Sequence, residues 1–276
     1  MRLDRADISA ILELLREVSS RDIMPRFRHL SPAMIRQKTG RLDQVTEADE
    51  AAEAALAQGL RALFPGTDII GEEQAAADPS CLALIEGDRP VFIIDPIDGT
   101  GNYAADLPLF GVMVALVHRN RTLAGFIHDP VGDDTAIGLV GEPAWIEQRD
   151  GDKALLQVAP PVPVGQMAGA ISWRFLPEPY RTRIMNRLDR VAASWDYRCA
   201  AHQYRMLAGG HCEIQLFGRT LPWDHAAGVL IHRQAGGYAA KFDGAPWLPS
   251  DRAGGLILAP DQPSWVALHE ALIGLT

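Results

Sequence analysis

The stretch that most constrains the fold of this chain is VFIIDPIDGTGNY, at residues 91–103. Its first four residues are apolar and predict a buried strand, and Pro96, which has no N–H to donate, predicts that the chain leaves the sheet there. Asp95 and Asp98 are therefore expected in a tight turn at the strand end. Two carboxylates that close repel each other unless one is protonated or a hard cation lies between them. The small residues that follow offer backbone N–H groups to an anion, so the loop combines cation ligands with an anion cradle.

Two further acidic segments have a similar setting. GEE, at residues 71–73, follows a short apolar strand, and LPWDHAAG, at residues 221–228, places Asp224 at the N-cap of a predicted helix. Taken alone, each is more often a solvated loop end or a plain helix cap, and a bare pair of aspartates three residues apart is common in turns. Together they place acidic groups at the ends of several elements. Scattered oxygen ligands of this kind suit Mg²⁺ better than a metal that prefers a His/Cys cage.

The overall charge excludes some partners. The 276 residues carry a formal net charge of -9, which is unfavourable for binding nucleic acid or an anionic membrane surface. The three cysteines, Cys81, Cys199 and Cys212, form no CxxC pair, which predicts reduced thiols and a cytoplasmic protein. The first twenty residues lack the apolar core of a signal peptide, and no apolar run is long enough to span a membrane. We therefore expect neither nucleic acid nor membrane among the partners.

Hydrophobic periodicity predicts layered helices and strands in two halves. In the first half we expect helices at residues 7–20 and 46–64, followed by strands that form one large antiparallel sheet. These strands are expected at residues 68–71, 91–95, 109–119, 122–130 and 132–147. The second half should hold helices at 178–192, 200–210, 224–237 and 263–274, and strands at 212–217 and 254–260. Prolines in residues 158–166 predict a boundary that divides the chain into residues 1–157 and 158–276.

The ordered segments GEE, DPIDGTGN and WDHAAG resemble the inositol monophosphatase family. VTEAD at residues 45–49 and AGG at residues 235–237 extend the resemblance, which covers roughly residues 38–240. Members of this family are Mg²⁺-dependent, lithium-sensitive phosphomonoesterases and are commonly dimeric, so a homodimer is expected. The resemblance implies an α+β fold, a layered αβαβα sandwich of the sugar-phosphatase type. Two subdomains would form one phosphatase domain, the first carrying the metal and phosphate loop and the second the last metal ligand and the substrate wall.

The resemblance also implies a set of metal ligands. Glu72, Asp95 and the carbonyl of Ile97 would hold one Mg²⁺, and Asp95, Asp98 and Asp224 would hold a second. A weaker third ion is expected near Glu72, so the cofactor is two to three Mg²⁺ ions. Bound metal ions neutralise a phosphate, lower the pKa of an attacking water and stabilise a leaving alkoxide. They also invert the local field of an acidic protein.

Roles in catalysis and substrate binding follow from the same resemblance. Thr100, hydrogen-bonded to Asp49, would orient and help to deprotonate the attacking water, and the backbone N–H groups of Gly99 and Thr100 would grip the phosphate. The implied catalytic residues are Thr100, Asp49 and Glu72. The implied substrate-binding residues are Asp98, Gly99, Thr100, Arg198, Ala200 and Asp224. The expected partner is a small-molecule phosphomonoester.

The expected substrate wall departs from the family pattern. Arg198 and Cys199 stand where the resemblance expects glycine and serine or threonine, and Phe217-Gly218-Arg219 stands near the place where inositol phosphatases have an acid. Arg198 or Arg219 is either a surface residue or a ligand for a second phosphate or a carboxylate. Inositol monophosphate, histidinol phosphate, fructose 1,6-bisphosphate and 3′-phosphoadenosine 5′-phosphate are therefore rival substrates, with histidinol phosphatase as the runner-up. A non-catalytic binding module of the same fold is the alternative from a different class.

Other polar residues have simpler interpretations. His225 is expected to be a hydrogen-bonded residue at a helix start rather than a metal ligand. Cys199 has no sequence neighbour that suggests a nucleophile and is interpreted as a small packing residue. The arginines of residues 178–192 predict a solvated helix face or a subunit contact.

Overall fold

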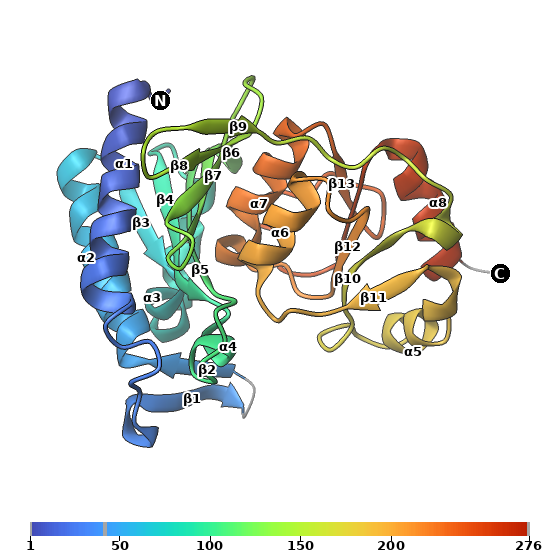
Figure 1. Cartoon of the computed structure of the whole chain (residues 1–276), viewed down its shortest axis with the longest axis horizontal. Helices are drawn as coiled ribbons and strands as arrows, with labels where there is room; N and C mark the ends of the chain where they lie inside the picture. Colours follow the sequence, from blue (N-terminus) through green and yellow to red (C-terminus); the bar gives the residue numbers. More distant parts are fainter. Residues whose placement is uncertain (1, 41–42, 275–276) are drawn as a thin grey trace.

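The computed structural model describes residues 2–40 and 43–274, which fold into five layers (Figure 1). Helices α1 (Arg5–Val18) and α2 (Glu47–Leu63) cover the outer face of a seven-stranded sheet. Helices α6 (Ala200–Ala208) and α7 (Pro222–Gln234) lie between this sheet and a five-stranded sheet, and α8 (Gln262–Leu272) covers the far side of the second sheet. The predicted αβαβα sandwich of the α+β class is confirmed.

The seven-stranded sheet has the strand order β3-β4-β5-β6-β7-β8-β9. Its strands are β3 (Asp68–Gly71), β4 (Val91–Asp98), β5 (Gly111–His118), β6 (Arg121–Asp129), β7 (Asp134–Leu139), β8 (Trp145–Gln148) and β9 (Lys153–Leu155). Neighbouring strands are antiparallel except β3 and β4, which are parallel, so the prediction of one antiparallel sheet is wrong at this edge. The cause is the crossover through α3 (Glu72–Ala77) and a 3-10 helix (Pro79–Glu86), which returns the chain before β4 begins.

The five-stranded sheet has the order β11-β10-β12-β14-β13 and mixes parallel with antiparallel pairs. Its strands are β10 (Ala168–Ser172), β11 (Ala193–Trp195), β12 (Ile214–Phe217), β13 (Tyr238–Lys241) and β14 (Leu256–Ala259). The hydrophobic pattern predicts β12 and β14 but misses β10, β11 and β13, which are five, three and four residues long. The first sheet ends at Leu155 and the second begins at Ala168. The division of the chain after residue 157 stays a prediction.

One buried core joins both sheets to the middle layer of helices. It includes Ile93 of β4, Tyr204 of α6 and Leu258 of β14. Helix α7 lies very close to β6, because a Cβ added at Gly125 would stand 2.7 Å from the Cα of Ala227. The fold therefore fixes α7 against the sheet that contains β4.

The arginine-rich segment predicted as one helix over residues 178–192 is broken. Helix α5 (Tyr180–Met185) is followed by a separate 3-10 helix (Leu188–Arg190). Three arginines donate hydrogen bonds to backbone carbonyls around the end of α8, in the pairs Arg183–Ile273, Arg187–Gly274 and Arg190–Ala271. Cations suit the C-terminal end of a helix. These three side chains therefore hold α8 in place, while Arg190 remains exposed, as a solvated face predicts. The subunit contact stays a prediction.

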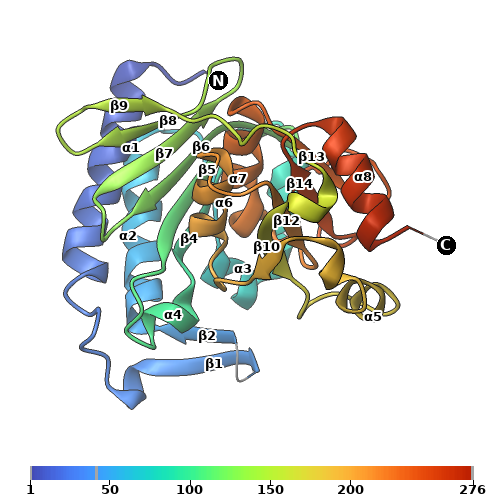
Figure 2. The same ribbon diagram turned by 45° about the vertical axis from the view of Figure 1, so that its right-hand side comes forward.

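A two-stranded sheet stands apart from the two large ones. It consists of β1 (Ile35–Gly40) and β2 (Asp43–Thr46), and it lies beside the short helix α4 (Thr100–Tyr103), as Figure 2 shows. The hairpin directly precedes α2 in the sequence. It therefore brings residues from the start of the chain to the end of β4.

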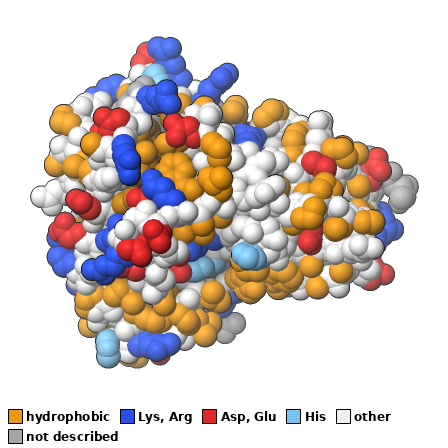
Figure 3. Space-filling model, turned by 45° about the horizontal axis from the view of Figure 1, so that its top comes forward, with side chains coloured by type: hydrophobic (Ala, Val, Ile, Leu, Met, Phe, Trp, Pro, Cys, Tyr) orange, Lys and Arg blue, Asp and Glu red, His pale blue; other side chains and the backbone are white. Residues whose placement is uncertain are grey.

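Charged side chains on the face shown in Figure 3 are of both signs. Most of them lie over the half built on the seven-stranded sheet, where lysines and arginines are interspersed with aspartates and glutamates. Such a mixture does not form the single basic surface that nucleic-acid binding uses. Within the described ranges, no helix is long and apolar enough to cross a membrane.

Candidate active site

Residues 91–98 form one strand, although the sequence predicts that the chain leaves the sheet at Pro96. Strand β4 continues to Asp98 through a bulge, where its pairing with β5 shifts by one residue between Asp95 and Asp98. Pro96 is tolerated because the pairing of β3 with β4 extends only to Ile94, so no strand on that side needs the missing N–H. The bulge brings both aspartates to the same end of the sheet.

Gly99 then turns the chain sharply into α4. Its φ of 85° lies in the left-handed region, and a Cβ there would stand 2.8 Å from the carbonyl oxygen of Leu109. Thr100 begins α4 directly after this turn. The N–H groups of a first helical turn have no acceptor within the helix. The loop can therefore present backbone donors next to the two aspartates.

Glu72 reaches the same place as the first residue of α3. Glu53 of α2 caps this helix, because its carboxylate accepts from the backbone N–H groups of Glu73 at 2.7 Å and Gln74 at 2.9 Å. Gly71 makes room for the cap, since a Cβ there would lie 2.1 Å from the Glu53 carboxyl carbon. The cap leaves Glu72 to line the pocket at the end of β4.

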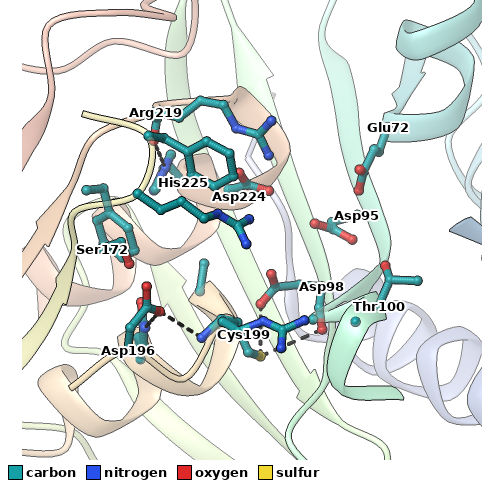
Figure 4. A pocket seen from close by; sticks show the side chains of 18 of the residues that line it. Glu72, Asp95, Asp98, Thr100, Ser172, Asp196, Cys199, Arg219, Asp224 and His225 are labelled. Atoms are coloured by element: carbon teal, nitrogen blue, oxygen red, sulfur yellow. Dashed lines mark hydrogen bonds between the residues drawn. The ribbon is translucent and has the colours of Figure 1, made fainter. Parts of the chain in front are cut away.

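Asp224 comes from the opposite side of the pocket, on α7. The prediction that it is the N-cap is wrong, because α7 begins at Pro222 with Leu221 at the cap position. Proline suits the first position of a helix, which lengthens α7 by two residues beyond the predicted start. Asp224 therefore lies within the first turn, and Figure 4 shows it facing Asp95 and Glu72.

Asp95, Asp98 and Asp224 form a compact carboxylate cluster. They offer oxygen atoms that all lie within 4.8 Å of one another. Asp95 is 1% exposed, and its Oδ1 is buried without a hydrogen-bond partner among the described residues. Burial raises the pKa of Asp224 to about 8 and that of Asp95 well above its usual value, and the charge of Glu72 adds to both shifts. A hard cation would satisfy the unpartnered oxygen, and a donor set made only of oxygens fits Mg²⁺.

Lys38 of β1 is a part of the site that the sequence does not indicate. Its Nζ lies 2.7 Å from Glu72 Oε1 and 2.5 Å from Glu73 Oε1. Burial opposes the charge of Lys38, but the two glutamates outweigh it, so the pKa of Lys38 is raised. Burial, together with the charge of Glu72, raises the pKa of Glu73 to about 7. Glu72 thus stands between an ammonium group and the aspartate cluster.

Thr100 and Asp49 form the predicted hydrogen bond. The Thr100 hydroxyl lies 3.0 Å from Asp49 Oδ1 and 2.9 Å from the carbonyl oxygen of Ile97. Asp49 Oδ2 accepts from the N–H and hydroxyl of Thr46 at 2.8 and 2.6 Å, so the capping box of α2 is complete. Burial raises the pKa of Asp49 to about 7, although these hydrogen bonds oppose the shift.

The pocket has a volume of about 150 Å³. Among the residues that the sequence singles out, it is lined by Glu72, Asp95, Ile97, Asp98, Gly99, Thr100, Arg198, Cys199, Ala200, Phe217, Gly218, Arg219, Asp224 and His225. Asp49 lies behind Thr100. Sequence reasoning misses Gln44, Ser172, Arg174, Phe175, Asp196 and Gln203, which also line it. The sequence offers one signal for this part of the pocket, which is an arginine beside an aromatic residue at Arg174-Phe175. These residues follow residues 168–172, which the hydrophobic pattern does not predict as a strand.

Cys199 contacts the aspartate cluster directly. Its Sγ lies 3.0 Å from Asp98 Oδ2, and the backbone N–H of Ala201 donates to the same oxygen. Burial and the charge of Asp98 raise the pKa of the thiol well above its usual value, so the thiol is protonated and donates. The interpretation of Cys199 as a packing residue is therefore incomplete, because it also holds Asp98 in orientation.

His225 is a hydrogen-bonded residue near the helix start, as predicted. Its Nε2 lies 2.9 Å from the carbonyl oxygen of Arg219, which can only accept, so Nε2 carries the proton. Its Nδ1 then accepts from the hydroxyl of Tyr204 at 2.8 Å. Burial lowers the pKa of His225 to about 4, so the ring is neutral at pH 7. Both ring nitrogens are occupied, and the backbone at Arg219 is held.

Comparisons with known proteins point to one family. The family model described as Inositol monophosphatase family matches residues 5–275. The Nus factor SuhB of Haemophilus influenzae is 34% identical over 232 residues, which cover 80% of this chain and 79% of that protein. The fructose-1,6-bisphosphatase/inositol-1-monophosphatase of Thermotoga maritima is 29% identical over 248 residues, covering 88% and 86%. A solved structure of a Thermotoga maritima IMPase has a TM-score of 0.76 at 26% identity and covers 96% of this chain and 93% of that one.

Proposed function

This chain belongs to the inositol monophosphatase family and is a phosphatase, and from that premise we propose that it releases phosphate from a small phosphorylated alcohol with Mg²⁺ as its cofactor. The observation that carries the proposal is the convergence of Asp95, Asp98 and Asp224 around a buried carboxylate oxygen that has no hydrogen-bond partner among the described residues. Like charges this close need a cation, and the cluster lies beside a loop with backbone donors for an anion.

The metal ligands in this proposal come from three elements, α3, β4 and α7. Glu72, Asp95 and the carbonyl of Ile97 would hold one ion, Asp95, Asp98 and Asp224 a second, and a third would lie near Glu72. When bound, the ions supply an acidified water and neutralise the charge on the phosphate. The all-oxygen donor set supports Mg²⁺ over Zn²⁺, since both nitrogens of His225 are already engaged.

The residues of the chain would move the proton of the attacking water. The Thr100 hydroxyl donates to Asp49 Oδ1 and keeps its lone pairs for the water. As the water loses its proton to Thr100 Oγ, the Thr100 proton passes to Asp49. The pKa of Asp49, raised to about 7 by burial, suits a carboxylate that accepts a proton near neutral pH. The backbone N–H groups of Gly99 and Thr100 would hold the phosphate during this transfer.

The identity of the alcohol is the finer part of the proposal. Inositol 1-phosphate, histidinol phosphate, fructose 1,6-bisphosphate and a 3′(2′),5′-bisphosphate nucleotide are the candidates. One relative is named for both fructose-1,6-bisphosphatase and inositol-1-monophosphatase activity. The complete carboxylate set argues against a binding module without catalysis. Cytoplasmic location, a homodimer and inhibition by millimolar lithium are proposed on composition and family resemblance.

Phosphate release from a panel of phosphomonoesters tests the function directly. The panel is run with Mg²⁺, with chelator, and with Mg²⁺ restored after chelation. We expect release that depends on Mg²⁺ and returns when the ion is restored. Release that persists in chelator would refute the metal assignment, and its absence with every ester would refute the function.

A further inference from the structure

A second charged surface faces the carboxylate cluster across the pocket. It consists of Arg174, Phe175 and Arg219, which come from the loop after β10 and the loop before α7. The guanidinium carbons of Arg174 and Arg219 lie 4.2 and 4.4 Å from the centre of the Phe175 ring. Two guanidinium groups stacked on one ring form a rigid pair of cations. In Figure 4, Arg219 reaches over the pocket above Asp224.

The position of Arg219 is fixed from behind. The hydroxyl of Tyr204 donates to His225 Nδ1, and His225 Nε2–H donates to the carbonyl of Arg219. Tyr204 and His225 are buried, at 0% and 1% exposure. A buried relay of this kind holds the backbone at residue 219 while its guanidinium extends into the pocket. The core therefore holds the backbone at Arg219, and the Phe175 ring supports its guanidinium.

Arg198 adds a cation on the other side of the pocket. Its φ of 55° lies in the left-handed region, at a position where the family resemblance expects glycine. The carboxylate of Asp196 holds this turn by accepting from the Arg198 backbone N–H at 2.8 Å. A Cβ added at Gly101 would stand 2.3 Å from Arg198 Nη2, so the guanidinium lies against the phosphate loop. A strained non-glycine residue at a site points to a function for its side chain.

Carboxylates also line the pocket near these cations. Asp196 is already engaged by the Arg198 backbone and by Gln203. Asp224 lies below Arg219 in Figure 4, and the ions of the proposed function would take up its charge. Within the part of the chain that the structure describes, neither Arg198 nor Arg219 forms a salt bridge with a carboxylate. A neutral polyol would leave this charge unused.

On the basis of the proposed function, we propose that the alcohol part of the substrate carries a second anionic group, a phosphate or a carboxylate, which Arg219 and Arg174 bind. Arg198 lies nearer the transferred phosphate, and Arg219 sets the preference for the second anion. Guanidinium groups bind both kinds of oxyanion in bidentate geometry. An amino alcohol ester such as histidinol phosphate, which places a cation at this wall, fits poorly.

Matched pairs of substrates test this preference. Fructose 1,6-bisphosphate is compared with fructose 1-phosphate, and 3-phosphoglycerate with glycerol 3-phosphate, each by kcat/KM with Mg²⁺. In each pair only the second anion differs. We expect at least one pair to favour the anionic member by on the order of 10- to 100-fold, as for a charge-assisted hydrogen bond. A preference within the fructose pair indicates a site for a second phosphate, and a preference within the glycerate pair indicates a site for a carboxylate.

Variants of Arg219 connect the preference to the wall. Arg219→Gln should reduce the preference by on the order of 10-fold or more, mainly through KM, and Arg219→Lys should reduce it less because the charge remains. Arg252→Gln, at an exposed arginine outside the pocket, should leave it unchanged. Circular dichroism checks that each variant is folded.

The possible failures are distinct. Equal kcat/KM within both pairs, or an equal loss on both members in Arg219→Gln, overturns the second-anion site and leaves the phosphatase function intact. No Mg²⁺-dependent release from any ester overturns the proposed function and the second-anion site together.

Discussion

The pocket has two differently built regions. Its carboxylate end consists of Asp95, Asp98 and Asp224, and its arginine wall consists of Arg174, Phe175 and Arg219. Asp95 and Asp98 are 1% and 9% exposed and lie on a strand of the seven-stranded sheet. Phe175, by contrast, is 43% exposed and belongs to a loop that follows β10. A reaction needs one fixed arrangement of its ligands, whereas a wall built from loops can change without disturbing the sheet. The comparison predicts that substitutions can alter the proposed choice of alcohol without altering the reaction.

The largest expected effect comes from removing one charge at the carboxylate end. Asp95→Asn keeps the size of the side chain but removes a proposed oxygen ligand from the cluster. We expect Mg²⁺-dependent phosphate release to fall by on the order of 10³-fold or more for every substrate, since metal-ion catalysis contributes several kcal/mol. Kinetics on both members of a matched substrate pair would measure it, because a loss at this end should not depend on the second anion.

The same variant has a readout that does not depend on turnover. Because burial and neighbouring carboxylates disfavour the charge on Asp95, Asp95→Asn should unfold in chelator at a Tm no lower than the parent protein. The increase in Tm that Mg²⁺ produces in the parent should be lost. Asp189→Asn, at an exposed aspartate, is the matched control. A variant that keeps near-normal turnover and a normal Mg²⁺ response would show that Asp95 is not a ligand.

A smaller effect is expected from the residue that would orient the water. Thr100→Ala removes the hydroxyl that donates to Asp49, and we expect kcat to fall by roughly 10²-fold while KM changes little. Thr100→Ser keeps the hydroxyl and should retain activity within a few-fold. Steady-state kinetics of the two variants side by side separates the roles. A rise in KM at constant kcat in Thr100→Ala would place the hydroxyl in binding instead.

Cys199 lines the pocket and contacts Asp98, so its substitution tests whether it acts on metal binding or on substrate preference. Cys199→Ala removes the thiol that donates to Asp98 Oδ2, and groups that orient a metal ligand typically contribute about 10-fold or more in metal affinity. We expect the Mg²⁺ concentration for half-maximal activity to rise by roughly 10-fold, without a change in substrate preference. Cys199→Ser should restore it. Cys212→Ala, which removes a buried thiol outside the pocket, controls for packing. A changed preference between matched substrates would instead assign Cys199 to the wall.

The two regions also differ in how far the sequence predicts them. The sequence indicates the proposed ligands Glu72, Asp95 and Asp224 because each follows or begins an element with a clear hydrophobic pattern, and the family resemblance groups them in one expected site. Their local structure was harder to predict. The bulge through Pro96 depends on where β3 stops pairing, and that is a property of the neighbouring strand.

The sequence predicts little of the arginine wall because the strand that leads into it is short. Strand β10 has five residues and no strong alternation, so the one sequence signal for Arg174 and Phe175 was an arginine beside an aromatic residue. The sequence does not indicate Lys38 as a site residue for a similar reason. Lys38 contacts Glu72 only when the hairpin of β1 and β2 packs against α3. Long-range contacts of this kind leave no periodic trace in the sequence. Arg198 and Arg219 were noticed through departure from a family pattern, and local spacing alone would not have indicated them.

The smallest effect concerns stability of the metal-free protein against pH. Burial raises the pKa of Asp224 to about 8 and that of Asp49 to about 7, from an ordinary value of 3.8. The folded state therefore binds more protons than the unfolded state up to these values, and stability falls as the pH rises toward 8. The buried histidines His128, His225 and His232 act oppositely but only below their unfolded pKa of 6.5, because burial lowers their folded pKa to about 4.

Between pH 6.5 and 8 the carboxylate end should therefore dominate, and the Tm in chelator should decline across this window. Saturating Mg²⁺ should weaken the decline, because the ion favours the deprotonated carboxylates that high pH produces. Asp224→Asn should flatten the slope in chelator, whereas Arg219→Gln, on the wall, should change it little. Thermal unfolding at several pH values, with chelator and with Mg²⁺, measures all of these slopes. A Tm that rises from pH 6.5 to 8 in chelator would contradict the protonated cluster, because raised carboxyl pKa values in the folded state can only make that slope negative.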